Sequence, residues 1–223
     1  LEGIKILDFT TIVMGPASTR ILSDCGAEVI KIESSSRSDT LRSATPYKGE
    51  DPSPNRSGYF AMYNAGKLSL PINMRNPESV NFVKEYLVPW ADIVVTAFTP
   101  RVLPMWGMTY DDLAEIKPEL IMLSACLMGN TGPYADLRGT GQLAAALSGW
   151  YENTGWPDKD PVGPYSAYAD FVSWNYFIVA VMAALDYRDR TGKGQYIDQS
   201  MFESTLQFAG PQLMYYLNEG KLT

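Results

Sequence analysis

The sequence contains no histidine among its 223 residues. This absence excludes Ser-His-Asp and Cys-His nucleophile systems, histidine general bases and histidine metal ligands. Any acid–base or nucleophilic chemistry must therefore use Asp, Glu, Lys, Tyr, Ser or Cys, and we expect no metal site.

Cysteine is also scarce. The two cysteines, Cys25 and Cys126, lie far apart and form no CxxC pair. Together with the lack of a secretory leader, this usage predicts a reduced, cytoplasmic setting. Cys25 follows Asp24 in an apolar helical pattern, and free cysteines are usually buried, so we expect a packed thiol rather than a nucleophile.

Three further absences exclude classes of ligand and partner. There is no GxGxxG pattern, which argues against a nicotinamide cofactor. The net charge is −7 and no basic run occurs, so neither nucleic acid nor an anionic membrane is expected as the main partner, although a small anionic ligand needs only a few local cations. The longest apolar stretch, 177–185, is shorter than the ~20 residues that span a bilayer.

The chain does contain an alternation of strand-like and helix-like segments, and 46% of its residues are hydrophobic, as in a folded globular protein. Strands are predicted at 3–9, 28–33, 68–73, 92–98, 119–125 and 196–200. Helices are predicted between a Gly15-Pro16 loop and Gly26, and at 76–92, 109–116, 141–150, 171–188 and 201–217. This order predicts an α/β fold, with a Rossmann-like, mostly parallel sheet and helices on both faces.

Two long tracts interrupt the alternation. Residues 34–58 are polar and rich in Ser, Pro and charge, and residues 126–168 hold several Gly and Pro turns around one small helix. Such tracts in a compact chain are often functional. By contrast, "RTGKGQ" (190–195) lacks the P-loop spacing and follows a helix, so we interpret it as a turn in which Gly stops the helix.

The segment "TTIVMGPAS" (10–18) joins a strand to a helix N-terminus, which is where ligands bind in open α/β sheets. Taken singly, Lys67 and Arg75 are best interpreted as solvated surface charges, and so are the arginines at 20, 42 and 138. As a set, these cations suit a phosphorylated ligand.

Asp170 stands in "SAYADFVSWNY" (166–176), just before the apolar run. Local spacing favours a helix N-cap, whose carboxylate accepts backbone N–H groups. A second interpretation makes the carboxylate a nucleophile that attacks an activated acyl group. The two roles are compatible, and spacing alone leaves both open.

Several segments together resemble the family III CoA-transferases, the group that includes formyl-CoA:oxalate and carnitine CoA-transferases. The resemblance extends over almost the whole chain. It is carried by "GIKILDFT", "CGAEVIKIE", "SDTLR", "NAGKLSL", "ADIVV", "KPELIMLSACLMGNTGPY", "SGWYENTG", "YADFVSW" and "RTGKGQYIDQSMFES". It implies the large CoA-binding domain of that fold, over residues 1–190, with residues 191–223 leading out toward a small domain that is absent from this sequence.

The resemblance also implies a reaction. In this family the aspartate of the segment matching "YADFVSW", here Asp170, attacks an acyl-CoA thioester. CoA is then carried as an aspartyl thioester and delivered to an acceptor acid. Acyl-CoA and a small carboxylic acid are therefore the implied partners, with coenzyme A carried as substrate and with no metal. Family members are about twice as long and form interlocked homodimers, so we expect this chain to be a piece of a longer polypeptide.

Contacts with CoA are implied at positions that match the family's binding residues. These are Ile12, Val13, Met14, Ile72, Arg75, Ala97, Phe98, Met105, Arg138 and Met201. Some departures are visible: formyl-CoA transferases carry glutamine where this chain has Val13, and basic residues where it has Ser34 and Met105.

Two alternatives remain beside the transferase. An α-methylacyl-CoA racemase has the same fold and a matching aspartate, but it uses a histidine that would fall in "LRGTGQ" (137–142). Proton exchange at an α-carbon needs a base on each face, so the lack of histidine disfavours it. The other alternative is a non-catalytic CoA-binding fragment.

Overall fold

The computed structural model describes residues 1–221 and contains one six-stranded sheet. Its strands are β1 (Lys5–Asp8), β2 (Glu28–Glu33), β3 (Leu68–Pro71), β4 (Ile93–Thr96), β5 (Ile121–Cys126) and β6 (Gln195–Ser200). They pair in the order β3-β2-β1-β4-β5-β6, and every pairing is parallel. The predicted α/β class with a Rossmann-like parallel sheet is confirmed.

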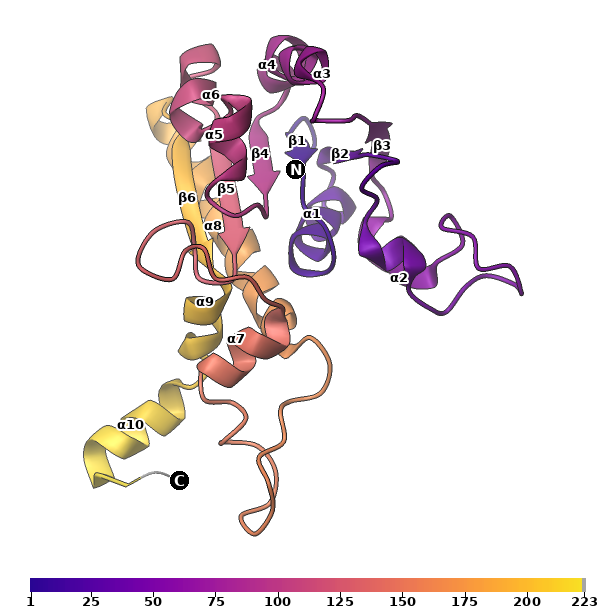
Figure 1. Cartoon of the computed structure of the whole chain (residues 1–223). Coiled ribbons are helices and arrows are strands. Elements are labelled where there is room, and N and C mark those ends of the chain that lie inside the picture. Colours follow the sequence, from indigo (N-terminus) through magenta and orange to yellow (C-terminus); the bar gives the residue numbers. More distant parts are fainter. Residues whose placement is uncertain (222–223) are drawn as a thin grey trace.

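Alternate residues of the central strands point to opposite faces of the sheet, and a separate core forms on each face. Ile6 and Ile93 belong to the first core, whereas Leu7 and Val94 belong to the second. The first core is covered by α1 (Met14–Asp24), α7 (Gly141–Leu147), α8 (Tyr168–Thr191) and α9 (Met201–Gln207). The second is covered by α3 (Pro77–Phe82), the π-helical turn η2 (Val83–Leu87), α4 (Val88–Trp90), α5 (Val102–Trp106) and α6 (Tyr110–Ile116). Helices therefore cover both faces, as predicted (Figure 1).

The first helix begins earlier than the sequence predicts. We expected a loop at Gly15-Pro16, but α1 begins at Met14 and both residues lie in its first turn. Proline is tolerated there because the N–H groups of the first turn have no partner within the helix. Gly15 is required for a different reason, since a Cβ at this position would overlap the Thr10 side chain.

The C-terminal segments also differ in their limits. The predicted helix at 171–188 is α8, which begins at Tyr168 and ends at Thr191, and the φ of 70° at the following Gly192 provides the expected glycine stop. The predicted helix at 201–217 is interrupted at Phe208 and Ala209, and α10 (Gly210–Glu219) follows. By length and composition α8 could cross a membrane, although Phe177 and Val181 on it are fully buried in the first core.

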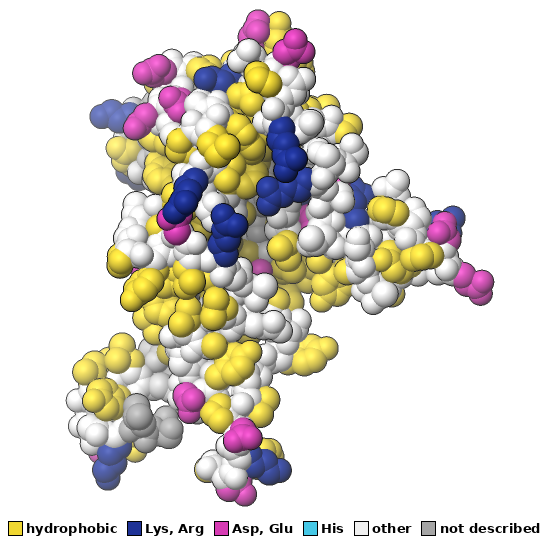
Figure 2. All heavy atoms as spheres, viewed as in Figure 1, with side chains coloured by type: hydrophobic (Ala, Val, Ile, Leu, Met, Phe, Trp, Pro, Cys, Tyr) yellow, Lys and Arg dark blue, Asp and Glu magenta, His cyan; other side chains and the backbone are white. Residues whose placement is uncertain are grey.

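The two irregular tracts surround the carboxyl ends of the strands. The first contains a 3₁₀ turn, η1 (Thr40–Ser43), and leads to α2 (Gly58–Asn64). The second runs from β5 to α8, with α7 in its middle, and its later part extends well away from the sheet (Figure 1). On the face drawn in Figure 2, Lys and Arg side chains gather around a hollow in the middle of the molecule.

Candidate active site

A cavity of about 430 Å³ lies where the strand order reverses, between β1 and β4. Ligands of open α/β sheets bind at this point, outside the carboxyl ends of the strands. The walls come from the connections that follow β1, β4 and β5 and from the first residues of α8 and α9. They consist of residues 11–15, Ala97, Thr99, 125–127, Ala135, 137–142, Ser166, Ala167, Asp170 and Met201.

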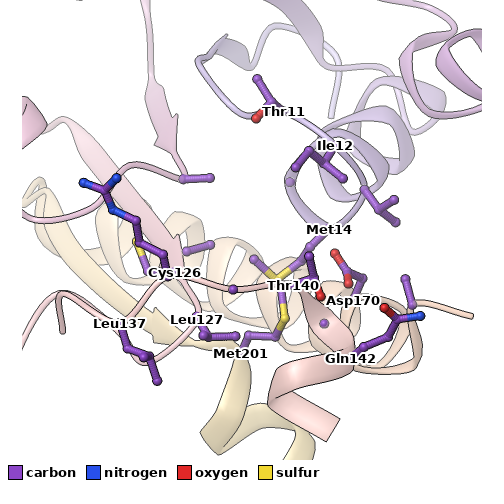
Figure 3. A pocket seen from close by; sticks show the side chains of 18 of the residues that line it. Thr11, Ile12, Met14, Cys126, Leu127, Leu137, Thr140, Gln142, Asp170 and Met201 are labelled. Atoms are coloured by element: carbon purple, nitrogen blue, oxygen red, sulfur yellow. The ribbon is translucent and has the colours of Figure 1, made fainter. Parts of the chain in front are cut away.

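Asp170 is the one acidic residue among the described residues that line this cavity. It is the third residue of α8, and only 7% of its surface is exposed. Figure 3 shows its carboxylate in the cavity near Met14, Thr140 and Gln142. The predicted N-cap role is wrong, because Tyr168 and Ala169 are already helical and Ala167 occupies the cap position.

The surroundings of Asp170 act on its pKa in two directions. Burial raises the pKa of the carboxyl to about 6, while backbone hydrogen bonds from Met14, Asp170 itself and Gly141 oppose the rise. Two of these N–H groups belong to helix starts, Met14 in α1 and Gly141 in α7, so they face an anion with favourable dipoles. The carboxylate is therefore ionised at neutral pH, but it is more basic than an exposed aspartate.

Gly141 fits closely against this carboxylate. A Cβ at position 141 would overlap Asp170 Oδ2 and would lie 3.0 Å from both Cγ and the backbone N of Asp170. Only glycine allows α7 to begin at this distance from the acid.

A buried ion pair fixes the end of β1 against the first turn of α1. Lys67 Nζ lies 3.1 Å from Asp8 Oδ2 and donates to the Pro16 carbonyl at 2.9 Å. The other oxygen of Asp8 accepts the Thr10 N–H at 2.8 Å. The prediction of a solvated Lys67 is therefore wrong, since its side chain is 2% exposed. Its partner lies 59 residues away in the sequence, so local reasoning could not identify it.

A second buried pair holds the next residues of the same loop. Lys31 Nζ lies 3.3 Å from Asp39 Oδ2 and donates to the Thr10 carbonyl at 2.7 Å. Both oxygens of Asp39 accept the N–H of Ile12 at 3.2 Å. Ile12 has a φ of 72°, in the left-handed region that β-branched residues rarely occupy.

A second hollow of about 180 Å³ adjoins the cavity and shares Thr11 and Ala97 with it. Its lining includes Arg37 and Arg75, and an apolar side formed by Phe98 and Trp106, whose rings meet edge to face with centroids 5.2 Å apart. The combination of two cations with aromatic surface suits a phosphorylated ligand that carries a flat ring.

The structure brings together nearly all of the residues that the resemblance implied. Ile12, Val13, Met14, Ala97, Arg138 and Met201 line the cavity with Asp170, and Ile72, Arg75, Ala97 and Phe98 line the adjoining hollow. Met105 lies in neither lining and is 80% exposed, so the prediction of a contact there has no support from these two hollows.

The other arginines separate into two groups. Arg75 and Arg138 belong to the linings, whereas Arg42 pairs with Glu33 beside the Phe60 ring, and Arg20 pairs with Asp24. Sequence reasoning missed Arg37, Thr140 and Gln142, which lie in tracts without periodicity. Only the general expectation that such tracts are functional indicated them.

The cysteines differ from each other and from prediction. Cys25, expected to be packed, is exposed because it ends α1 just before Gly26. Cys126 is buried at the cavity wall, where its thiol donates to the Phe98 carbonyl, and burial raises its pKa to about 11. Among residues 1–221, no group of three or more Cys, Asp or Glu side chains could hold a metal ion.

Comparison with known proteins places the chain in a family. All of residues 1–223 match the family described as CoA-transferase family III. The chain is 36% identical to an acetyl-CoA:oxalate CoA-transferase of Acetobacter aceti, over 99% of this chain and 55% of that protein. It is 37% identical to the human succinyl-CoA:glutarate CoA-transferase, over 92% of this chain and 45% of that protein. The chain thus spans about half the length of the curated relatives it matches.

Solved structures agree with this assignment. A CAIB/BAIF family protein from Brucella suis superposes with a TM-score of 0.92 at 35% identity, over 100% of this chain and 58% of that one. The protein Rv3272 from Mycobacterium tuberculosis superposes with a TM-score of 0.89 at 30% identity, over 98% of this chain and 59% of that one. The chain therefore belongs to CoA-transferase family III.

Proposed function

We propose that this chain carries the CoA-binding and nucleophilic part of a CoA-transferase, which moves CoA from an acyl-CoA to a carboxylic acid through a covalent intermediate on Asp170. One observation carries the proposal: Asp170 is the single acidic side chain in the described lining of the cavity, and the first residues of two helices, Met14 and Gly141, line it beside the acid. A buried carboxylate in a cavity at the strand ends is a fitting nucleophile for an acyl group.

In the proposed cycle, CoA passes from one carboxyl group to another, and the energy of the thioester bond is conserved. The Asp170 carboxylate attacks the thioester carbonyl, the C–S bond breaks, and an acyl-aspartyl anhydride and CoA thiolate form. The thiolate then attacks the aspartyl carbonyl, which gives aspartyl-CoA and releases the first acid. The acceptor carboxylate attacks aspartyl-CoA, and the same two steps run in reverse to release the new acyl-CoA.

The properties of Asp170 suit this role. A pKa of about 6 leaves most of the carboxyl ionised at neutral pH, and it makes the anion a better nucleophile than a carboxylate with an ordinary pKa. Each tetrahedral intermediate needs donors for its oxyanion, and we propose the backbone N–H groups of Met14 and Gly141, which line the cavity with Asp170.

In our proposal, the two hollows hold different parts of the CoA molecule. The thioester end lies in the cavity beside Asp170, Met14 and Met201, and the nucleotide end lies in the adjoining hollow with Arg75 and Phe98. The linking chain of CoA passes Thr11 and Ala97, which belong to both linings. Arg138 at the cavity wall adds a cation for the phosphates or for the acceptor acid.

The proposal for the whole protein rests on its relatives. Those named above act on acetyl-CoA with oxalate and on succinyl-CoA with glutarate, so we propose small organic acids as the acceptors. We further propose that residues 1–190 form the CoA-binding domain and that residues 191–223 lead toward a smaller one. A cytoplasmic homodimer is the proposed assembly.

Trapping of the intermediate tests this function. The full-length protein is incubated with succinyl-CoA and then with hydroxylamine, and the peptide that contains Asp170 is weighed by mass spectrometry. We expect a hydroxamate on Asp170, none in Asp170→Asn, and loss of CoA transfer in both Asp170→Asn and Asp170→Ala.

Other outcomes identify the alternatives. Full transfer by Asp170→Ala would refute the covalent mechanism. Binding of CoA without any hydroxamate on Asp170 would indicate a non-catalytic binding module. Exchange of the α-hydrogen of a branched acyl-CoA with deuterated water would instead indicate a racemase.

A further inference from the structure

Ile12 adopts a backbone conformation that its own side chain disfavours. Its φ is 72°, and a β-branched residue in this region is strained unless its surroundings hold it there. Its side chain is 46% exposed and lines the cavity, so no surrounding core holds it in place (Figure 3). The strain must therefore be balanced by bonds to the backbone.

Asp39 supplies those bonds. Both of its carboxylate oxygens accept the Ile12 N–H at 3.2 Å, and one of them also accepts the Leu41 N–H at 3.0 Å. Asp39 is 1% exposed, so these bonds compete with no water. Lys31 balances its charge from 3.3 Å and binds the Thr10 carbonyl, two residues before Ile12.

The loop that this pair holds leads directly to the nucleophile. Val13 follows Ile12 and caps α1 without any side-chain hydrogen bond. Met14 comes next and lines the cavity beside the Asp170 carboxylate (Figure 3), where its backbone N–H opposes the rise in the pKa of that carboxyl. The direction of that N–H is fixed by the backbone at residues 12 and 13, because two dihedral angles per residue determine the course of the chain.

We propose that Asp39, held by Lys31, is a positioning residue: it keeps Ile12 in the left-handed conformation and thereby aims the Met14 N–H at the Asp170 carboxylate. The inference rests on the proposed function of Asp170. Neither Asp39 nor Lys31 lines the cavity, so neither is a catalytic residue.

Burial of this pair is hard to explain by stability alone. Removing two charges from water costs about as much as their attraction returns, and apolar pairs of similar size are often at least as stable. A specific geometric task, namely to hold one strained residue through its N–H, accounts for a buried carboxylate here, because an apolar side chain could not accept that bond.

The test removes the Asp39 carboxylate in two backgrounds, one with the strained Ile12 and one with a glycine that is unstrained at position 12. In the full-length protein, Asp39→Ala should slow the acylation of Asp170 about tenfold or more, measured as hydroxamate formed in a single turnover with succinyl-CoA. We expect the rate constant to fall by more than the affinity for the thioester. Glycine adopts a φ near 70° freely. Relative to the Ile12→Gly single variant, the Ile12→Gly/Asp39→Ala double variant should therefore acylate less than about threefold more slowly.

Two further variants separate positioning from folding. Lys31→Met with Asp39→Leu replaces the charged pair by apolar side chains, and we expect slow acylation with a melting temperature near that of the wild type. Asp92→Asn breaks a partly buried pair with Arg188, away from the cavity, and should leave acylation unchanged.

The results distinguish failure of this inference from failure of the proposed function. If Asp39→Ala acylates at the wild-type rate while Asp170→Ala does not acylate, the positioning role is wrong and the function stands. If Asp39→Ala slows acylation as much in the Ile12→Gly background as in the wild type, the route through Ile12 is wrong. If the wild type itself forms no hydroxamate, the function fails, and a crystal structure of Asp39→Ala decides: residue 12 should leave the left-handed region, and its persistence there would overturn the proposal.

Discussion

Gly141 lies directly against the carboxylate of Asp170, although 29 positions separate the two residues and they lie in the first turns of different helices. The start of α7 therefore forms part of the surface on which the acid rests. Four predictions follow from this and from the other contacts of the site.

Gly141→Ala should slow acylation of Asp170 by about 100-fold, because the added methyl group would overlap the carboxylate and push it away from its position. The protein should still fold, since position 141 has no positive φ. Gly210→Ala is the matched control: it also adds a methyl near the start of a helix, but it meets no atom within 4 Å. Equal rates in the two variants would contradict the close fit.

The acylation rate should depend on pH through Asp170. Burial raises the pKa of this carboxyl to about 6, so the nucleophilic anion is lost as the pH falls through this value. We expect the single-turnover rate to rise about tenfold per pH unit below 6 and to level above 7. A profile that is flat between pH 5 and 7 would show that the carboxyl has an ordinary pKa.

The same carboxyl should reduce stability at neutral pH. Its pKa is higher in the folded protein than the usual aspartate value of 3.8, so the folded state favours the protonated acid. The resulting penalty is absent below pH 4, grows between 4 and 6, and is complete above 6. Asp170→Asn should therefore be more stable than the wild type by up to about 3 kcal/mol at pH 7. Urea unfolding at pH 7 and pH 4 measures the difference, which should nearly vanish at pH 4.

Lys67→Met should destabilise the fold by about 3–5 kcal/mol, because it leaves Asp8 buried without its nearest cation. Asp8→Asn in the same protein should recover part of the loss, since the uncompensated charge is then gone. Asp186→Asn breaks an exposed pair with Arg190 and should leave the melting temperature unchanged. A Lys67→Met protein as stable as this control would show that the buried pair does not contribute to the stability of the fold.

Much of the fold was predictable because it depends on local periodicity. The central strands β4 and β5 are short apolar runs, and alternate strand residues face different cores, so the α/β order could be predicted from the sequence. Helix limits were less accurate, as α8 and α9 show, because caps and interruptions depend on tertiary contacts. The proposed role of Asp170 came from the resemblance along the chain, while local spacing alone favoured a cap.

The rest of the site depends on contacts between distant residues. A lysine before a strand looks solvated until its acid is known, and Lys67 meets Asp8 only through the sheet. Likewise, nothing in the sequence marks Ile12 as left-handed, because that conformation is imposed by Asp39, 27 positions later. Gly141 resembled any other turn glycine until its distance to Asp170 was known.

The cavity wall begins at Thr11 and ends at Met201, so it includes residues from nearly both ends of the chain. During synthesis, Thr11 leaves the ribosome first and Met201 follows roughly 190 residues later, which takes about 10–40 s at roughly 5–20 residues per second. Strand β6, which directly precedes Met201, pairs with β5 and lies at one edge of the sheet within residues 1–221. An emerging chain therefore has no complete cavity until residue 201 has been made, and a thioester cannot stabilise the fold through this cavity before that point.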